Sequence, residues 1–238
     1  MNEEEIRKNA IVFAKKNKIK IAKELVNPIE YLPDKFPISV FMSGSPGAGK
    51  TELSKRLIDI IEKDVKHRVV RVDGDEIRYR IPGYTGSNSY LFQGAISLIV
   101  EKMHDLLLHN NQSFIFDSTM SNYEKAVDNI NRSIDKSRAA FLFYVYQRPE
   151  IAWKFTQARE KKEGRNIPKE AFIKEFFNSR DTVEKIMLKY GNKINTFLVK
   201  KDFITNNEQY TVNLTSENKG IDEYILEKYN RDDLNRIL

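Results

Sequence analysis

The sequence feature that most constrains this chain is segment 44–51, which reads GSPGAGKT. A glycine, four further residues and then Gly49, Lys50 and Thr51 give the spacing of a nucleotide phosphate loop. An apolar run precedes the segment and a helix-forming stretch over 52–61 follows it. Small residues let successive backbone N–H groups turn inward around phosphate oxygens, and the helix start adds its positive dipole end. Strand, loop and helix in this order predict a site for ATP or GTP rather than a ligand-free turn.

Individual residues of this loop have expected roles at the nucleotide. We expect Lys50 to reach the β- and γ-phosphates and the Thr51 hydroxyl to ligate Mg²⁺. ATP is the expected nucleotide, with GTP as the alternative, and Mg²⁺ is the expected metal. The predicted nucleotide-binding residues are Gly44, Ser45, Pro46, Gly47, Ala48, Gly49, Lys50, Thr51 and Glu52.

The composition limits the class of protein. Of the 238 residues, 40% are hydrophobic and 31% are charged, as in ordinary globular domains. The chain has no cysteine, which excludes disulfides, thiolate catalysis and cysteine-bound zinc. No run approaches the roughly 20 apolar residues of a membrane span, and residues 1–8 show no secretory signal, so we expect a cytoplasmic protein without a membrane partner. The net charge of +6 attracts polyanions, so a nucleic-acid partner stays open.

Apolar runs alternate with helix-forming stretches along the chain. Strands are expected at 38–43, 68–72, 113–116, 139–146, 194–199 and about 210–214. Helices are expected at 1–25, 52–61, 89–109, 123–137, 149–163, 168–190 and from 221. This alternation predicts an α/β protein with three layers and a mainly parallel, doubly wound sheet. We expect one domain, with a helical extension over 1–35 packed on a core over 36–200, and a further extension over 201–238.

Two aspartates follow the second expected strand, at the edge where the carboxyl ends of parallel strands collect active groups. Phosphoryl transfer to an alcohol needs a carboxylate that accepts the hydroxyl proton. Asp75 is the expected base. Asp73 is the better candidate for capping a helix that starts near Glu76. It is also expected among the substrate-binding residues.

Asp117 and Thr119 follow the third expected strand at the same edge. Asp117 is placed like a carboxylate that acts on Mg²⁺ directly or through water, and Thr119 like a donor to substrate or phosphate. The alternative for Asp117 is an N-cap of the next helix, a role that Ser121 or Asn122 can also fill.

Two further features stay open from the residues alone. Arg159 and Arg165 lie in a basic segment, about 159–168, which either folds over the nucleotide as a lid or ends a helix in solvent. Glu101 lies on the helix expected at 89–109, among apolar neighbours. It is either a substrate-binding carboxylate or an exposed residue, and the pattern alone favours exposure.

Together these motifs resemble the zeta-toxin family of P-loop kinases, over roughly residues 38–200. The loop matches the family form Gly-x-Pro-Gly-Ser/Ala-Gly-Lys-Thr, including Pro46. Segment 72–78 matches the family's Asp-x-Asp block, in which the second aspartate is the base, so the resemblance gives this role to Asp75. Glu101 falls where the family has a glutamate that contacts the sugar nucleotide. Arg159 and Arg165 resemble the two arginines that close on the phosphates.

The block 116–119 resembles the family's Glu-Gly-Thr block with departures. Asp117 replaces the glutamate, Ser118 replaces the glycine, and Met120 precedes a position where family members often carry arginine. These changes concern the acceptor side more than the ATP side.

The resemblance implies an ATP- and Mg²⁺-dependent kinase of UDP-N-acetylglucosamine or a related UDP-amino sugar, and a toxin restrained by an antitoxin. It also implies a P-loop kinase-like fold. Two other functions stay open. One is a polynucleotide 5′-hydroxyl or nucleoside kinase, which uses the same core. The other is a non-catalytic nucleotide-dependent switch, although no guanine-reading Asn-Lys-x-Asp segment is evident.

Overall fold

A single six-stranded sheet organises the protein, for which a computed structural model describes residues 2–65, 67–201, 208–217 and 219–238. The strand order is β2-β3-β1-β4-β5-β6. Strands β1 to β5 pair in parallel, and β6 pairs antiparallel with β5. The predicted mainly parallel sheet is confirmed. The strands are β1 Ile38–Ser43, β2 Val70–Asp73, β3 Phe114–Asp117, β4 Ala139–Tyr146, β5 Asn195–Lys201 and β6 Glu208–Asn213.

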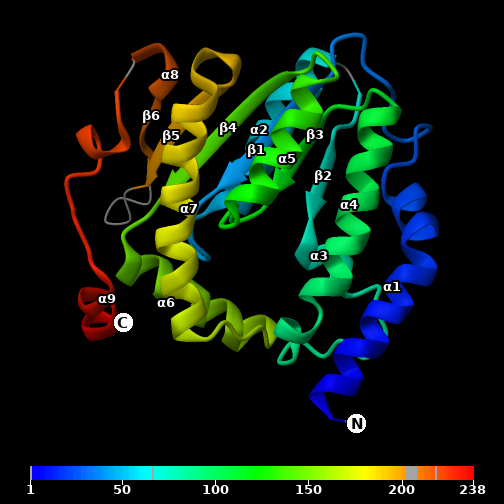
Figure 1. Ribbon diagram of the computed structural model, residues 1–238, viewed down its shortest axis with the longest axis horizontal. Helices are drawn as coiled ribbons and strands as arrows, with labels where there is room; N and C mark the ends of the chain where they lie inside the picture. Colours follow the sequence, from blue (N-terminus) through cyan, green and yellow to red (C-terminus); the bar gives the residue numbers. More distant parts are fainter. Residues whose placement is uncertain (1, 66, 202–207, 218) are drawn as a thin grey trace.

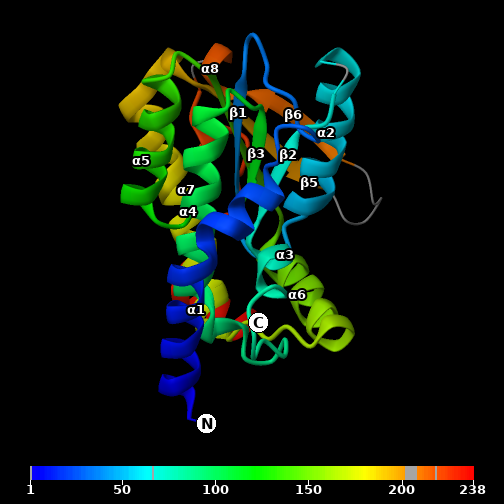
Figure 2. The same cartoon turned by 90° about the vertical axis from the view of Figure 1, so that its right-hand side faces the viewer.

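Helices cover both faces of the sheet (Figures 1 and 2). Helix α2 packs on one face through Leu53, and α4, α5 and α7 cover the other, so each face has its own apolar cluster. Burial on both faces explains why the strands are almost uninterrupted apolar runs. The helices are α1 Glu3–Leu25, α2 Lys50–Val65, α3 Gly74–Arg78, α4 Gln93–His109, α5 Tyr123–Ile134, α6 Pro149–Glu163, α7 Lys169–Tyr190, α8 Leu214–Glu217 and α9 Arg231–Ile237. None of the helices within the described ranges is long and apolar enough to cross a membrane.

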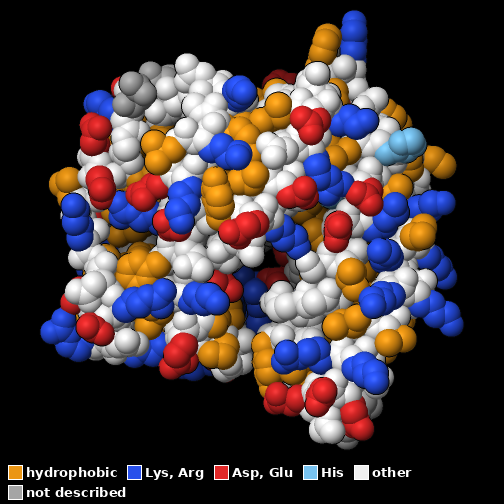
Figure 3. Space-filling view, viewed as in Figure 1, with side chains coloured by type: hydrophobic (Ala, Val, Ile, Leu, Met, Phe, Trp, Pro, Cys, Tyr) orange, Lys and Arg blue, Asp and Glu red, His pale blue; other side chains and the backbone are white. Residues whose placement is uncertain are grey.

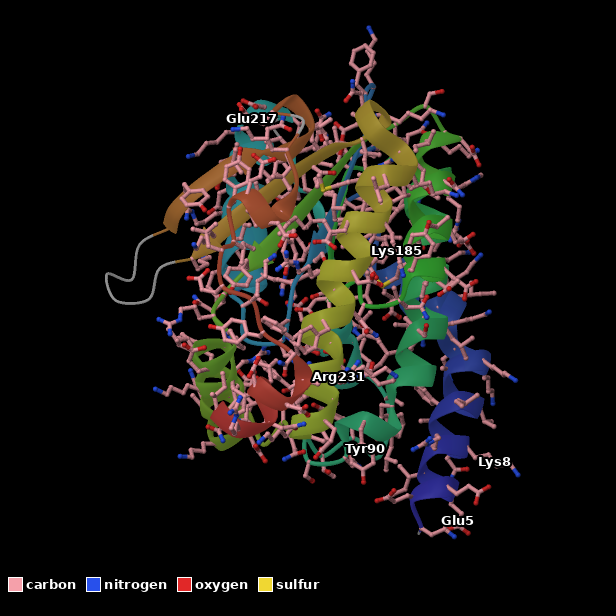
Figure 4. The ribbon with its side chains drawn as sticks, turned by 60° about the vertical axis from the view of Figure 1, so that its left-hand side comes forward. Glu5, Lys8, Tyr90, Lys185, Glu217 and Arg231 are labelled. Atoms are coloured by element: carbon pink, nitrogen blue, oxygen red, sulfur yellow. The ribbon has the colours of Figure 1, made fainter. Side chains whose placement is uncertain are left out.

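Helix α1 packs along α4. Ala10 and Ala14 are buried in the cluster that α4 also joins. The first turns project beyond the body of the protein, where Glu5 and Lys8 point away from it (Figure 4). The hydroxyl of Tyr90, just before α4, donates a hydrogen bond to Glu3 and ties this end of α1 to the core.

The expected helix from residue 221 is wrong. A short 3-10 turn spans Ile221–Glu223, and α9 begins only after Asn230. There the Asn230 side chain accepts a hydrogen bond from the Asp233 N–H at 2.9 Å, and the Asp233 carboxylate accepts one from the Asn230 N–H at 3.0 Å. This reciprocal capping box defines a helix start that the apolar pattern alone placed too early.

A buried histidine on α4 gives stability a pH dependence. The His104 side chain is fully buried, with its ring edge-to-face against Phe114 and Phe116. Burial, assisted by the charge of Arg132, lowers the pKa of His104 from 6.5 to about 3. The unfolded chain therefore binds this proton first as the pH falls. We expect His104 to reduce the free energy of unfolding by about 2 kcal/mol between pH 7 and pH 5.

Urea unfolding of wild type and His104→Leu at both pH values checks this expectation. The difference between the two proteins isolates His104, because the carboxylates titrate in both. If the free energy of unfolding falls equally in the two proteins, His104 binds its proton equally well in the folded and unfolded states, which would contradict the expectation.

Candidate active site

The phosphate loop joins β1 to α2 and requires its glycines. Gly44, Gly47 and Gly49 have φ values of +141°, +72° and +89°, a region that L side chains rarely adopt. A Cβ atom on Gly44 would lie 2.4 Å from the Val145 carbonyl oxygen, and one on Gly47 would lie 2.1 Å from that of Ala152. The glycines therefore let the loop lie against the end of β4 and the start of α6.

Replacing Gly47 with alanine should displace the loop. A strained backbone costs on the order of 1–3 kcal/mol, and the clash with the Ala152 backbone adds to it. We expect at least tenfold weaker binding of a fluorescent ATP analogue and a lower melting temperature. Gly191→Ala is the matched control, since Gly191 also has positive φ, at +49°, but nothing lies within 4 Å of its Cβ position. Unchanged nucleotide binding by Gly47→Ala would contradict the loop geometry.

Lys50 lies across the loop that it follows. Its Nζ atom donates hydrogen bonds to the carbonyl oxygens of Gly44 at 2.9 Å and Ser45 at 2.7 Å. The side chain is buried, and burial lowers the pKa of Lys50 while the charge of Asp117 opposes this shift. The ammonium group is thus held beside the loop by neutral acceptors, at the position expected of a phosphate-binding lysine.

Asp73 has the contacts of a helix cap. Its Oδ1 atom accepts a hydrogen bond from the Asp75 N–H at 2.8 Å at the start of α3, and its Oδ2 atom pairs with Arg71. Burial, with the charge of Asp75, raises the pKa of Asp73 to about 6. Both carboxylate oxygens are engaged within the protein, so these contacts support the capping interpretation rather than a substrate contact.

Asp75 is surrounded by arginines from three parts of the chain. Its Oδ2 atom pairs with Arg165 and lies 3.3 Å from Nη2 of Arg159, and its Oδ1 atom lies 3.0 Å from Nη1 of Arg78. Arg159 is on α6, and Arg165 is in the loop before α7. The structure thus brings the expected base and both expected lid arginines together.

Asp117 and Thr119 follow β3 beside the phosphate loop. Asp117 Oδ2 accepts hydrogen bonds from Ser54 Oγ at 3.0 Å and Arg71 Nε at 3.2 Å. The Thr119 carbonyl oxygen accepts one from the Gly44 N–H at 3.3 Å, while its hydroxyl faces Ser121 Oγ at 3.3 Å. Within the described ranges no group of three His, Asp or Glu side chains could hold a metal ion. Asp117 and Thr51 nevertheless line the same cleft and offer the hard oxygen donors that Mg²⁺ prefers.

These groups line one cleft of about 1350 Å³ at the carboxyl ends of β1, β2 and β3. The space-filling view shows the molecule hollowed there, with acidic and basic side chains at the margin (Figure 3). The volume exceeds that of a typical single drug-sized ligand site, so the cleft has room for a nucleotide and a second molecule. One half of the cleft lies between α4 and α5, where Ser97, Val100 and Lys125 line it.

The structure places Glu101 outside the cleft in which its substrate contact was expected. Glu101 is exposed on α4 and does not line the cleft, whereas Ser97, one helical turn earlier, does. Ser97 and Val100 lie on the face of α4 that lines the cleft, and Glu101 lies on another face of the helix. The residue pattern, which favoured exposure, was the better guide here than the resemblance.

The structure adds two charged residues that the sequence analysis missed. Arg78 ends α3 and is only 4% exposed. Glu175 on α7 also lines the cleft, and burial raises the pKa of its carboxyl group against the opposing charges of Lys50 and Arg165. Glu175 follows Phe172 by three residues and precedes Ser179 by four, so a carboxylate on the buried stripe of a helix was its sequence signal.

The strand order, the phosphate loop and the cleft define the fold class of P-loop kinases. A structure from the PezAT chromosomal toxin–antitoxin system of Streptococcus pneumoniae shares this fold, with a TM-score of 0.66 and 16% identity over 94% of this chain and 90% of that one. The native AvrRxo1-ORF1:ORF2 complex contains a chain with a TM-score of 0.59 and 12% identity, over 91% and 71%.

The Zeta toxin family model matches residues 23–218, and the chain belongs to this family. This match confirms the resemblance inferred from the motifs. A curated relative, the probable adenylyl-sulfate kinase of Aeropyrum pernix, is 30% identical over 108 residues, which is 44% of this chain. The alignment spans 56% of that relative's length.

Proposed function

We propose that the protein is an ATP- and Mg²⁺-dependent kinase that transfers the γ-phosphoryl group to a hydroxyl of a small acceptor. The observation that carries the proposal is the position of Asp75, in one cleft with the phosphate loop and with Arg159 and Arg165. A nucleotide-dependent switch transfers no phosphoryl group to an acceptor, so it does not require a general base in this cleft. A phosphotransferase needs one beside the terminal phosphate.

In this reaction the acceptor oxygen attacks the γ-phosphorus as Asp75 takes the hydroxyl proton, the bond from the γ-phosphorus to the bridging oxygen breaks, and ADP leaves. Lys50 neutralises charge on the β- and γ-phosphates. Arg159 and Arg165 release Asp75 and neutralise the charge on the transferring phosphoryl group. Thr51 and Asp117 would hold Mg²⁺ together with phosphate oxygens. Bound there, the metal supplies charge neutralisation at the phosphates.

Family membership supports the acceptor class. We propose a UDP-amino sugar such as UDP-N-acetylglucosamine, bound in the half of the cleft between α4 and α5, with Thr119 on its boundary. An antitoxin protein is the proposed partner, since the structure from the PezAT system belongs to a toxin–antitoxin pair. A kinase that consumes ATP and UDP-sugars would act in the cytoplasm.

The test offers Mg-ATP with separate UDP-sugars, nucleosides and 5′-hydroxyl oligonucleotides, and identifies products by mass. We expect a mass gain of one phosphoryl group on a UDP-amino sugar, and none without Mg²⁺. Phosphorylated oligonucleotides or nucleosides alone would instead identify a nucleic-acid or nucleoside kinase. ATP binding without any phosphorylated product across the panel would overturn the kinase proposal in favour of a switch.

A further inference from the structure

The three arginines around Asp75 differ in how firmly the fold holds them. The Arg159 side chain is 41% exposed and that of Arg165 is 18% exposed, and both belong to the basic segment after the middle of α6. The Arg78 side chain is 4% exposed, one turn after Asp75 on the same helix. Its neighbour Ile77 is buried in the main core cluster. Ile77 thus anchors the backbone beside Arg78 in the core, whereas Arg159 and Arg165 belong to a more exposed segment.

The arginines also divide the two oxygens of the Asp75 carboxylate between them. Arg159 and Arg165 both pair with Oδ2. Arg78 pairs with Oδ1 at 3.0 Å. In the proposed reaction Arg159 and Arg165 pair with the phosphate, which frees Oδ2 to accept a proton while Oδ1 keeps its partner.

We propose that Arg78 is the positioning residue of the base, which holds Oδ1 so that Oδ2 faces the acceptor hydroxyl during transfer. This role rests on the proposed function, because it assigns a part in phosphoryl transfer. A single carboxylate on a five-residue helix has several side-chain rotamers, and one fixed oxygen selects among them. Catalysis by a base depends on such placement, since a displacement of about 1 Å can cost 10²-fold in rate.

The hydrogen bonding of Arg78 argues against a purely structural role. Its Nε and Nη1 atoms are buried and have no hydrogen-bond partner among the described residues, so the 3.0 Å contact between Nη1 and Asp75 Oδ1 is an ion pair without hydrogen-bond geometry. A buried arginine that stabilises the fold typically donates to backbone carbonyls, as Arg138 does to Ile38 at 2.9 Å and to Gln112 at 2.6 Å. For Arg78, the ion pair with Asp75 offsets the desolvation penalty of the buried charge.

The kinetic test compares Arg78→Met and Arg78→Lys with wild type, using UDP-N-acetylglucosamine as the acceptor. We expect Arg78→Met to lower kcat by roughly 10- to 100-fold, with KM for Mg-ATP and the affinity for a fluorescent ATP analogue within about twofold of wild type. Arg78→Lys should recover part of the loss. The matched control is Arg80→Met, since Arg80 is 43% exposed and pairs with Glu24 on α1.

A structure with Mg²⁺ and a non-hydrolysable ATP analogue tests the same inference without any acceptor. We expect Arg159 and Arg165 on the γ-phosphate and Arg78 still within hydrogen-bond distance of Asp75 Oδ1. Arg78 on the phosphate, or turned away from Asp75, would overturn the inference. This arm also decides the matter if Arg78→Met does not fold.

The outcomes separate the inference from the proposed function. If wild type phosphorylates the acceptor and Arg78→Met keeps full kcat, the inference is wrong and the kinase stands. If wild type phosphorylates nothing in the panel, the proposed function fails, and the positioning role fails with it whatever the analogue structure shows.

Discussion

Replacing Asp75 with asparagine is expected to lower kcat for phosphoryl transfer by roughly 10²–10⁴-fold. Asparagine has nearly the same shape but cannot accept the hydroxyl proton of the acceptor. The rate is measured by the mass or radioactivity of the phosphorylated product at saturating Mg-ATP. Because the proposed role of Asp75 concerns the acceptor hydroxyl, we expect affinity for the ATP analogue to change far less than kcat.

The same substitution should also reduce stability. The carboxylate neutralises Arg78 and Arg165, whose side chains are 4% and 18% exposed, and removing one partner of a buried pair leaves an uncompensated charge. Melting temperature is therefore measured beside activity. Glu76→Gln is the matched control, because Glu76 is the next residue on α3 with a side chain that is 64% exposed. More than a tenth of wild-type kcat in folded Asp75→Asn would show that another group is the base.

Replacing Lys50 with methionine is expected to lower kcat/KM for Mg-ATP by roughly 10²–10³-fold. Methionine keeps the length and apolar stem of the side chain but removes the ammonium that neutralises the β- and γ-phosphates. Activity and binding of the fluorescent ATP analogue are measured together, since a loss in both places Lys50 at the nucleotide rather than at the acceptor.

Lys50→Met should not lose stability, although it loses activity. Burial lowers the pKa of Lys50, which means that the charged form is disfavoured in the folded protein. We therefore expect the melting temperature of Lys50→Met to equal or exceed that of wild type. Lys63→Met, at an exposed position near the end of α2, controls for loss of a positive charge. A destabilised Lys50→Met would show that the ammonium supports the fold.

Local sequence patterns were sufficient for much of the fold. Strand, phosphate loop and helix follow one another without a break at 38–65, so short-range spacing and glycine positions define this unit. The start of α6 at Pro149 and its end before Gly164, which has φ of +70°, were likewise readable from residues that act locally. The later start of α9 was not, because a capping box there competes with an apolar pattern.

The site was less readable, because its parts meet across long stretches of chain. Arg159 and Arg165 lie 84 and 90 residues from Asp75, and their spacing alone did not distinguish a lid from a solvated helix end. Glu101 was misplaced for the opposite reason, since a motif position was carried over without the helix phase that decides its direction. Glu175 was missed although its place on the buried stripe of α7 was a signal in the sequence.

The phosphate loop was predicted from spacing within a few residues. The mainly parallel sheet, and the edge of it where Asp75 lies, were predicted from the alternation of apolar runs and helix-forming stretches along the chain. The capping role of Asp73 was likewise predicted from local sequence, whereas the sharing of the two Asp75 oxygens among three arginines became evident only from the packed fold. Ion pairs between distant segments depend on how α3, α6 and α7 pack around one cleft. No local pattern contains that packing.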